Sequence, residues 1–204
     1  MRRNLVILLH GVGSNGNNLM PLAKAWARVL PNTDFVSPDG PELFGHGEGR
    51  QWFSVNGVTE ANRPERVVDA RATFDRVLKG IIDAHGQTDH LDRVALVGFS
   101  QGSIMALDAL ASGRWPVAAV VAFSGRLASP LPLTPSPSTR ALLIHGDADP
   151  VMPLAGSERA VAILRSAGIA ADLQVLAGIG HTISHDGVQI AGAFLAETLA
   201  LSGQ

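Results

Sequence analysis

The segment 98–102, of sequence GFSQG, constrains the fold of this chain more than any other feature. It follows the apolar run 94–97 and precedes small residues with helical spacing. A G-x-S-x-G sequence between a buried strand and a helix is typical of a nucleophile elbow, a turn that strains the serine backbone and holds its hydroxyl clear of the sheet. Both glycines are needed because a Cβ at either position would meet the neighbouring strand or helix. We therefore predict a strand–turn–helix unit that presents Ser100 as a nucleophile.

Composition and charge narrow the class of protein. With 204 residues, of which 46% are hydrophobic and 17% charged, the chain is long enough for a sizeable core, and we expect one domain over residues 1–204. Its net charge of −2 comes from 16 basic and 18 acidic side chains without a basic patch, which argues against a nucleic-acid partner. The absence of cysteine excludes disulfides, thiolate metal sites and a cysteine nucleophile, and it leaves the redox compartment open.

The amino-terminal residues resemble a signal peptide only in outline. Two arginines precede an apolar run, but the run 5–9 is shorter than the apolar region of a signal peptide and continues into His10 and Gly11 without a small-residue cleavage site. A buried first strand accounts for this run better. No run approaches the roughly 20 apolar residues of a membrane span, so we expect a cytoplasmic protein without stable membrane insertion.

Short apolar, β-branched runs alternate with longer helical stretches along the chain. This alternation is typical of an α/β fold in which a doubly wound, mostly parallel sheet has helices on both faces. We predict strands at residues 4–10, 34–38, 93–98, 117–123, 140–145 and 171–176. We predict helices at residues 18–29, 64–85, 101–112, 154–167 and 187–201.

Two irregular segments interrupt the alternation. Residues 38–62 are rich in glycine, and residues 125–139 contain four prolines. Both segments are long for plain connections and are therefore candidates to border a site. Neither is long enough for a separate lid domain, so we expect a sheet without a large lid.

A serine hydroxyl becomes a nucleophile when a base takes its proton and a third group orients that base. After the predicted strand 140–145 come two carboxylates, Asp147 and Asp149, and the glycine-flanked His181 follows the last predicted strand. Carboxyl ends of parallel strands meet at one edge of a sheet, where open α/β sheets bind ligands. We predict Ser100 as nucleophile, His181 as general base and Asp149 as the orienting acid, with Asp147 stabilising the turn.

The tetrahedral intermediate of such a reaction carries an oxyanion that needs backbone donors. The N–H of Gln101, at the start of the helix after the elbow, is one predicted donor. The other is expected from the loop after the first strand, and we assign it to the N–H of Val12.

Five short motifs occur in one order along the chain: LHGVG at 9–13, QWF at 51–53, GFSQG at 98–102, HGDADP at 145–150 and GH at 180–181. In sequence and order they resemble the carboxylesterase and acyl-protein thioesterase (phospholipase/carboxylesterase) family of α/β-hydrolases. The resemblance covers nearly the whole chain. It implies the α/β-hydrolase fold, the same triad and oxyanion donors, and a metal-free esterase that acts on acyl esters or thioesters with the acyl chain in an apolar groove.

The resemblance also bears on the substrate pocket. Trp52 and Phe53 match a Trp-Phe pair of the family. This match favours a place in the pocket wall for both residues, and plain core packing is the alternative. Val151 and Met152 follow the predicted acid and complete the set of predicted substrate-binding residues. Substrate identity stays open because the chain departs from the family pattern at several positions, namely Ser14, Ser54, Ser103 and Met152.

Two other kinds of site compete with this interpretation. Residues 11–16 satisfy G-x-G-x-x-G after a strand, the fingerprint of an NAD-dependent oxidoreductase. Asparagines surround its last glycine and the only candidate for the expected acid is Asp39, so an oxyanion loop is the better interpretation. His181 and His185 have the spacing of a metal pair, but no third ligand is evident. We therefore predict no cofactor and no metal.

The predicted function is hydrolysis of small to medium-chain carboxylic esters through an acyl-serine intermediate. Acyl-protein thioesterase and lysophospholipase activities are alternatives within the class, since all three share that intermediate. A hydrolase fold used only for binding is a further alternative, disfavoured because no member of the triad is missing. The expected partner is a small-molecule acyl ester or thioester, and an exposed apolar groove mouth would favour a homodimer.

Overall fold

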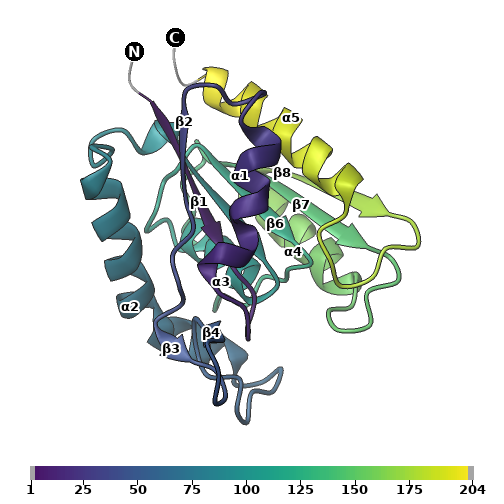
Figure 1. Cartoon of the computed structure of the whole chain (residues 1–204). Coiled ribbons are helices and arrows are strands. Elements are labelled where there is room, and N and C mark those ends of the chain that lie inside the picture. The colour runs from purple at the N-terminus through teal and green to yellow at the C-terminus, as the bar shows by residue number, and fades with distance from the viewer. Residues whose placement is uncertain (1–2, 202–204) are drawn as a thin grey trace.

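The computed structural model describes residues 3–201, and its elements follow the predicted alternation of strands and helices (Figure 1). The first two residues of the amino-terminal stretch discussed above lie outside this range. The strands are β1 (Asn4–Leu9), β2 (Thr33–Val36), β3 (Glu42–Leu43), β4 (Arg50–Gln51), β5 (Val94–Phe99), β6 (Ala119–Phe123), β7 (Arg140–Gly146) and β8 (Ala170–Leu176). The α-helices are α1 (Met20–Trp26), α2 (Arg63–Ala84), α3 (Gln101–Ala111), α4 (Ala155–Ser166) and α5 (His185–Leu201), and the short 3-10 helices are η1 (Gly16–Leu19) and η2 (Leu91–Arg93).

Six strands form one sheet in the order β2-β1-β5-β6-β7-β8, and each neighbouring pair is parallel. From β1 the chain first extends the sheet on one side with β2 and then crosses to the other side with β5. The boundary between β1 and β5 is therefore the topological switch point, where the carboxyl ends of the strands leave a crevice for ligands. The predicted doubly wound α/β fold is confirmed.

Successive side chains of a strand point to opposite faces of the sheet, and helices cover both faces. In β1, Leu5, Ile7 and Leu9 pack in the core formed with α2, α3 and α4. Val6 and Leu8 pack in the core formed with α1 and α5, the two helices on the near side in Figure 1. All five side chains are fully buried, so β1 joins the two halves of the hydrophobic core.

Residues 38–62 contain a two-stranded antiparallel hairpin, β3–β4, that the sequence analysis did not predict. The hairpin is bonded to the loop after β1, because the Gly13 N–H donates to Arg50 O at 2.9 Å and the Arg50 N–H donates to Ser14 O at 2.7 Å. A Cβ on Gly49 would lie 2.9 Å from Gly13 O, so glycine permits this close approach. The irregular segment thus shapes the carboxyl edge of the sheet.

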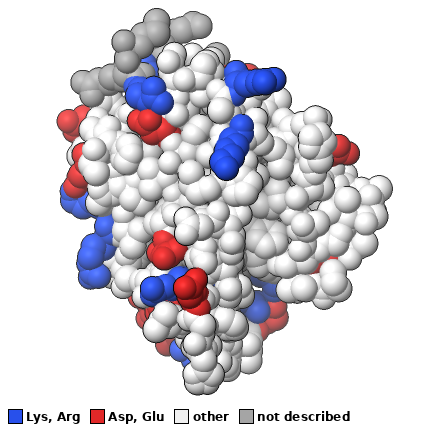
Figure 2. Space-filling model, in the orientation of Figure 1, with Lys and Arg blue, Asp and Glu red and all other residues white. Residues whose placement is uncertain are grey.

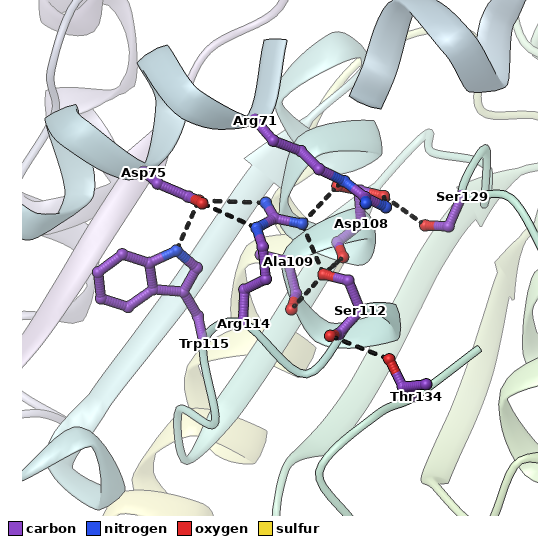
Figure 3. Close-up of polar contacts among 9 residues, drawn as sticks. All are labelled: Arg71, Asp75, Asp108, Ala109, Ser112, Arg114, Trp115, Ser129 and Thr134. Atoms are coloured by element: carbon purple, nitrogen blue, oxygen red, sulfur yellow. Dashed lines mark hydrogen bonds and ion pairs between the residues drawn. The ribbon is translucent and has the colours of Figure 1, made fainter. Parts of the chain in front are cut away.

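A buried carboxylate links α2 to α3 (Figure 3). Asp108 of α3 accepts hydrogen bonds from Arg71 of α2 at 2.8 and 2.9 Å and from Arg114 at 2.9 Å. Arg114 also binds Asp75 of α2, and Ser129 of the proline-rich segment donates to Asp108 at 2.7 Å. Burial alone would raise the pKa of Asp108, but the hydrogen bonds it accepts outweigh burial and lower the pKa. The carboxylate therefore stays ionised and holds three segments together.

Charged side chains on the face shown in Figure 2 are scattered, and Lys and Arg are interspersed with Asp and Glu. Among the described residues, no helix is both long and apolar enough to cross a bilayer. The longest helix, α2 with 22 residues, packs one apolar stripe against the core.

Candidate active site

Ser100 lies at a tight turn between β5 and α3, in the strained conformation predicted for it. Its φ of 53° and ψ of −113° lie outside the regions that non-glycine residues ordinarily adopt. A Cβ on Gly98 would lie 2.4 Å from Ser103 N, and a Cβ on Gly102 would lie 2.0 Å from Leu9 O. Only glycine fits at these two positions, and the turn can therefore place Ser100 at the carboxyl edge of the sheet.

Three side chains that are distant in sequence meet at this edge. His181 Nε2 lies 3.0 Å from Ser100 Oγ, and His181 Nδ1 lies 2.7 Å from Asp149 Oδ2. The three residues follow β5, β7 and β8, so three strand ends of the same sheet each supply one side chain. The result is a continuous hydrogen-bonded chain, with the geometry in which an imidazole can take a serine proton.

The loop after β7 holds Asp149 in place. Its Oδ1 accepts hydrogen bonds from the N–H groups of Val151 at 2.9 Å and Met152 at 2.8 Å, which leaves Oδ2 for His181. Burial alone would raise the pKa of Asp149. The hydrogen bonds that it accepts, of which the one from the Met152 N–H has the largest effect, outweigh burial and lower the pKa. The group is therefore an anion at neutral pH and can stabilise an adjacent imidazolium.

Asp147, the alternative acid, has other partners. Its Oδ1 accepts a hydrogen bond from the Gly178 N–H at 2.7 Å, and its own N–H donates to Leu176 O at 3.1 Å. These bonds join the loop after β7 to the loop that carries His181. Asp147 therefore stabilises the turn, as predicted.

His145 supports the same loop and is fully buried. Its Nε2 donates to Met152 O at 2.7 Å, and its Nδ1 lies 2.7 Å from Ser157 Oγ. His145 Nε2 also lies 3.4 Å from Asp149 Oδ2. These bonds across the loops give His145 a structural role.

The two predicted oxyanion donors lie beside Ser100. Gln101 is the first residue of α3, so its N–H is not used by the hydrogen bonds of the helix. Val12, in the loop after β1, lines the same cavity as Ser100 and Gln101. The two backbone segments that would bind an oxyanion therefore border the cavity that opens at the serine.

Hydrogen bonds hold the loop that carries Val12. Trp52 Nε1 donates to His10 O at 2.9 Å, His10 Nδ1 donates to Gly11 O at 2.8 Å, and His10 Nε2 accepts from the Gly40 N–H at 2.8 Å. Burial lowers the pKa of His10, which favours the neutral ring that this pattern requires. His10 therefore has a structural role in this loop.

The side chain of Gln101 has a second role, which the sequence analysis missed. Its Oε1 accepts a hydrogen bond from the Trp52 N–H at 2.8 Å, and its Nε2 donates to Phe53 O at 2.8 Å. The residue after the nucleophile therefore fixes the segment that forms one wall of the cavity. The only sequence signal was a long amide side chain at the variable position of the elbow motif.

A cavity of about 260 Å³ opens at Ser100. Of the four residues predicted to bind substrate, Phe53, Val151 and Met152 line the cavity, whereas Trp52 does not. Trp52 is 1% exposed, and its ring packs edge-on against Phe74 at 5.4 Å. Its Nε1 also donates a hydrogen bond to His10 O at 2.9 Å, which turns the ring toward the loop after β1. The prediction that Trp52 forms the pocket wall is therefore corrected: it packs behind the wall, in the core.

Ser124 is another functional candidate that the sequence analysis missed. It follows β6 with a φ of 46°, is buried, and its side chain hydrogen-bonds to Asp149. A strained, non-glycine residue at a strand end next to a site is a recognised sign of a functional constraint. A serine–glycine pair directly after a predicted strand was the available signal.

The residues that suggested a nucleotide site or a metal site have structural partners instead. The Gly16 N–H donates to Asp39 Oδ1 at 2.8 Å, so the protein's own carboxylate lies where a pyrophosphate would bind. A Cβ on Gly16 would lie 2.0 Å from Ser37 O, which accounts for the glycine by packing. His185 begins α5 and lies beside the Gln189 side chain, with Nε2 2.9 Å from Nε2. Among residues 3–201, no group of three potential ligands of the His, Cys, Asp or Glu type is placed to hold a metal ion.

A doubly wound parallel sheet with this elbow at its carboxyl edge defines the class of α/β-hydrolases. The family model described as Phospholipase/Carboxylesterase matches residues 1–199. The chain therefore belongs to the phospholipase/carboxylesterase family and is a hydrolase.

Known proteins agree with this assignment. Esterase YpfH of Escherichia coli is 39% identical over 93% of this chain and 80% of its own length. Acyl-protein thioesterase 1 of Neurospora crassa is 27% identical over 95% of this chain and 86% of its own length. The crystal structure of esterase PE8 has a TM-score of 0.83 at 36% identity, covering 97% of this chain and 93% of that one. The structure of Arabidopsis thaliana SOBER1, with a TM-score of 0.75 at 22% identity over 97% of this chain and 99% of that one, shares the fold.

Proposed function

We propose that the protein is a serine carboxylesterase that hydrolyses small to medium-chain acyl esters through an acyl-serine intermediate. The observation that carries the proposal is the unbroken chain of hydrogen bonds from Ser100 through His181 to Asp149. Relatives named esterase and acyl-protein thioesterase support the same chemistry.

Each proposed catalytic group has one task. His181 Nε2 takes the proton of Ser100 Oγ as the oxygen attacks the ester carbonyl, and Asp149 stabilises the imidazolium that forms. The N–H groups of Val12 and Gln101 bind the oxyanion of the tetrahedral intermediate. The intermediate collapses when His181 gives its proton to the leaving alcohol oxygen. Water then repeats the sequence on the acyl-serine and releases the acid.

The position of His181 indicates where the substrate lies. Because the imidazole must reach the leaving oxygen, the alcohol group has to lie on the His181 side of the serine. Ser100, Val12 and Gln101 line the cavity and His181 does not, so we assign the cavity to the acyl group. Its volume of about 260 Å³ is below the roughly 300–1,000 Å³ of sites for drug-sized ligands. Small to medium acyl chains fit this size.

Thioesters and lysophospholipids would pass through the same acyl-serine. The likeness to acyl-protein thioesterase 1 makes a thioester the second candidate substrate. The serine and the base serve both reactions, so the choice depends on the leaving group outside the acyl cavity.

A substrate panel tests the proposal. Esters of 4-nitrophenol with acyl chains of two to twelve carbons, and matched thioesters, are compared by kcat/KM. We expect a maximum at short to medium esters, and we expect Ser100→Ala to lower kcat by about 10⁶-fold. Ser166→Ala, which removes a hydroxyl at the end of α4, is the control. A Ser100→Ala enzyme with a tenth of the wild-type rate contradicts the proposal.

Cytoplasmic location, the absence of a cofactor and homodimer formation remain predictions from the sequence. Cell fractionation tests the location, and activity in the presence of a chelator tests whether a metal ion is required. Light scattering coupled to size-exclusion chromatography tests whether the protein forms a dimer. We expect the chelator to leave activity unchanged, because the proposed steps use only side chains and backbone amides.

A further inference from the structure

Two arginine side chains line the acyl cavity. Arg63 is the first residue of α2, and Arg126 lies shortly after β6. The two side chains are only 17% and 14% exposed. None of the described residues that line this cavity is acidic. The cavity, whose other lining residues are mostly apolar, therefore contains two cations.

A single carboxylate faces both arginines from the rim. Glu60 lies 2.6 Å from Arg63 Nη1 and 2.5 Å from Arg126 Nη1, and its own side chain is 75% exposed. The hydrogen bond from Arg63 lowers the pKa of Glu60, so this group stays charged. One negative charge opposes two positive charges, and the cluster is a net cation at the cavity.

The two guanidinium groups retain unused donors. Arg126 Nε points to Met152 Sδ at 2.7 Å, a weak acceptor. Within residues 3–201, Arg63 Nε and Nη2 and Arg126 Nη2 have no hydrogen-bond acceptor. Removing a cation from water without a full partner is unfavourable, and a planar carboxylate is the ligand that a guanidinium fork fits best.

We infer that Arg63 and Arg126 bind a carboxylate at the far end of the acyl group, so that the preferred substrates are half-esters of dicarboxylic acids. The inference rests on the proposed function, since the acyl group enters the cavity only when Ser100 attacks the ester. Val55, Val58 and Ile104 line the same cavity and contact the methylene groups of the acyl chain. Apolar walls that include two cations match a short chain that ends in an anion.

Two substrates of equal acyl length isolate the carboxylate. Mono-4-nitrophenyl adipate and 4-nitrophenyl hexanoate have six acyl carbons and the same leaving group, and they differ in the terminal charge. We expect kcat/KM of the wild-type enzyme to be at least about tenfold higher for the adipate half-ester, after subtraction of uncatalysed hydrolysis. Added NaCl reduces this preference, because ions screen the attraction.

Arginine variants assign the preference to the two residues. Arg63→Gln and Arg126→Gln should each reduce the adipate-to-hexanoate ratio of kcat/KM about tenfold. Arg66→Gln is the matched control: it lies one turn further along α2, lines a different cavity and changes the net charge equally. The control should keep the wild-type ratio.

A gain-of-function variant separates the inference from misfolding. Glu60→Gln removes the carboxylate that competes for both guanidinium groups. We expect it to lower KM for the adipate half-ester about threefold or more, with a smaller change for hexanoate.

The outcomes separate this inference from the proposed function. Hydrolysis of hexanoate without a preference for adipate, or a preference that survives both arginine variants, overturns the inference and leaves the esterase intact. Hydrolysis of neither ester overturns the proposed function and the inference with it. A preference lost in both variants, kept in Arg66→Gln and strengthened in Glu60→Gln supports the inference.

Discussion

Asp147 and Asp149 lie two residues apart after β7 and have different partners. Asp149 binds His181 and two N–H groups of its own loop, whereas Asp147 binds the Gly178 N–H across the loops. The two side chains are chemically identical, and the donors around each one determine its role: Asp149 orients the histidine and Asp147 stabilises the turn.

Asp149→Asn tests this assignment. The carboxylate accepts a hydrogen bond from His181 Nδ1–H, whereas the NH2 group of the asparagine amide can only donate to Nδ1. The variant therefore favours the wrong imidazole tautomer, and we expect kcat to fall about 10⁴-fold. Asp147→Asn keeps an oxygen acceptor for Gly178 and should retain most of the activity. Steady-state kinetics on 4-nitrophenyl butyrate gives both values, and a larger loss in Asp147→Asn would reverse the assignment.

Among single residues, the elbow serine and the order of acid and base were predictable, because each lies in a short motif that can be recognised in the sequence. The role of Trp52 could not be predicted, since sequence does not specify which of two adjacent aromatic residues faces the cavity. Arg126 and Ser124 were missed for a related reason: each acts through partners that only the folded chain brings near.

Helices α2 and α3 are joined by the buried Asp108 and its two arginines (Figure 3). Because α3 begins directly after Ser100 and α2 begins at Arg63, this link connects two helices whose first residues line the cavity at Ser100. The link is electrostatic and buried, so removing the charge leaves arginines without a full partner.

Asp108→Asn should lower the free energy of unfolding by about 3–5 kcal/mol at neutral pH, measured by urea denaturation. The pKa of Asp108 in the folded protein is lowered, so its stabilisation is present above the pKa of the unfolded chain and is lost as pH falls through the folded-state value. The difference between wild type and variant should therefore be constant above about pH 5 and narrow below about pH 4.

A surface carboxylate serves as the control for this variant. Asp172 pairs with Arg165 on the surface, and Asp172→Asn should change stability by less than about 1 kcal/mol. An Asp108→Asn protein as stable as this control at pH 7 would contradict the buried link.

The main strands and helices were predictable because each has an apolar pattern that continues over several residues. Hairpin β3–β4 was not, since strands of two residues show no periodicity. Helix α1 begins at Met20 after a 3-10 turn and ends at Trp26, inside the predicted range 18–29.

The whole molecule is organised around one sheet with a core on each face. Strand β1 contributes side chains to both cores, and the six strands are continuous from β2 to β8. Because the same strands carry both cores, we expect the two cores to unfold together. We therefore propose that the chain is a single domain.

Calorimetry tests this proposal. We expect one unfolding transition whose calorimetric and van't Hoff enthalpies agree, because both cores share the sheet. Two separated transitions, or limited proteolysis that releases a stable folded fragment, would show two independent units.

The central claim, that Ser100 is an activated nucleophile, is tested most directly by covalent labelling. A fluorophosphonate is incubated with the native protein, and intact and peptide mass spectrometry locate the adduct. We predict one adduct per chain, on Ser100, with loss of esterase activity in proportion to labelling and no adduct on Ser100→Ala. An unmodified Ser100 in a folded protein that still hydrolyses esters would contradict the claim.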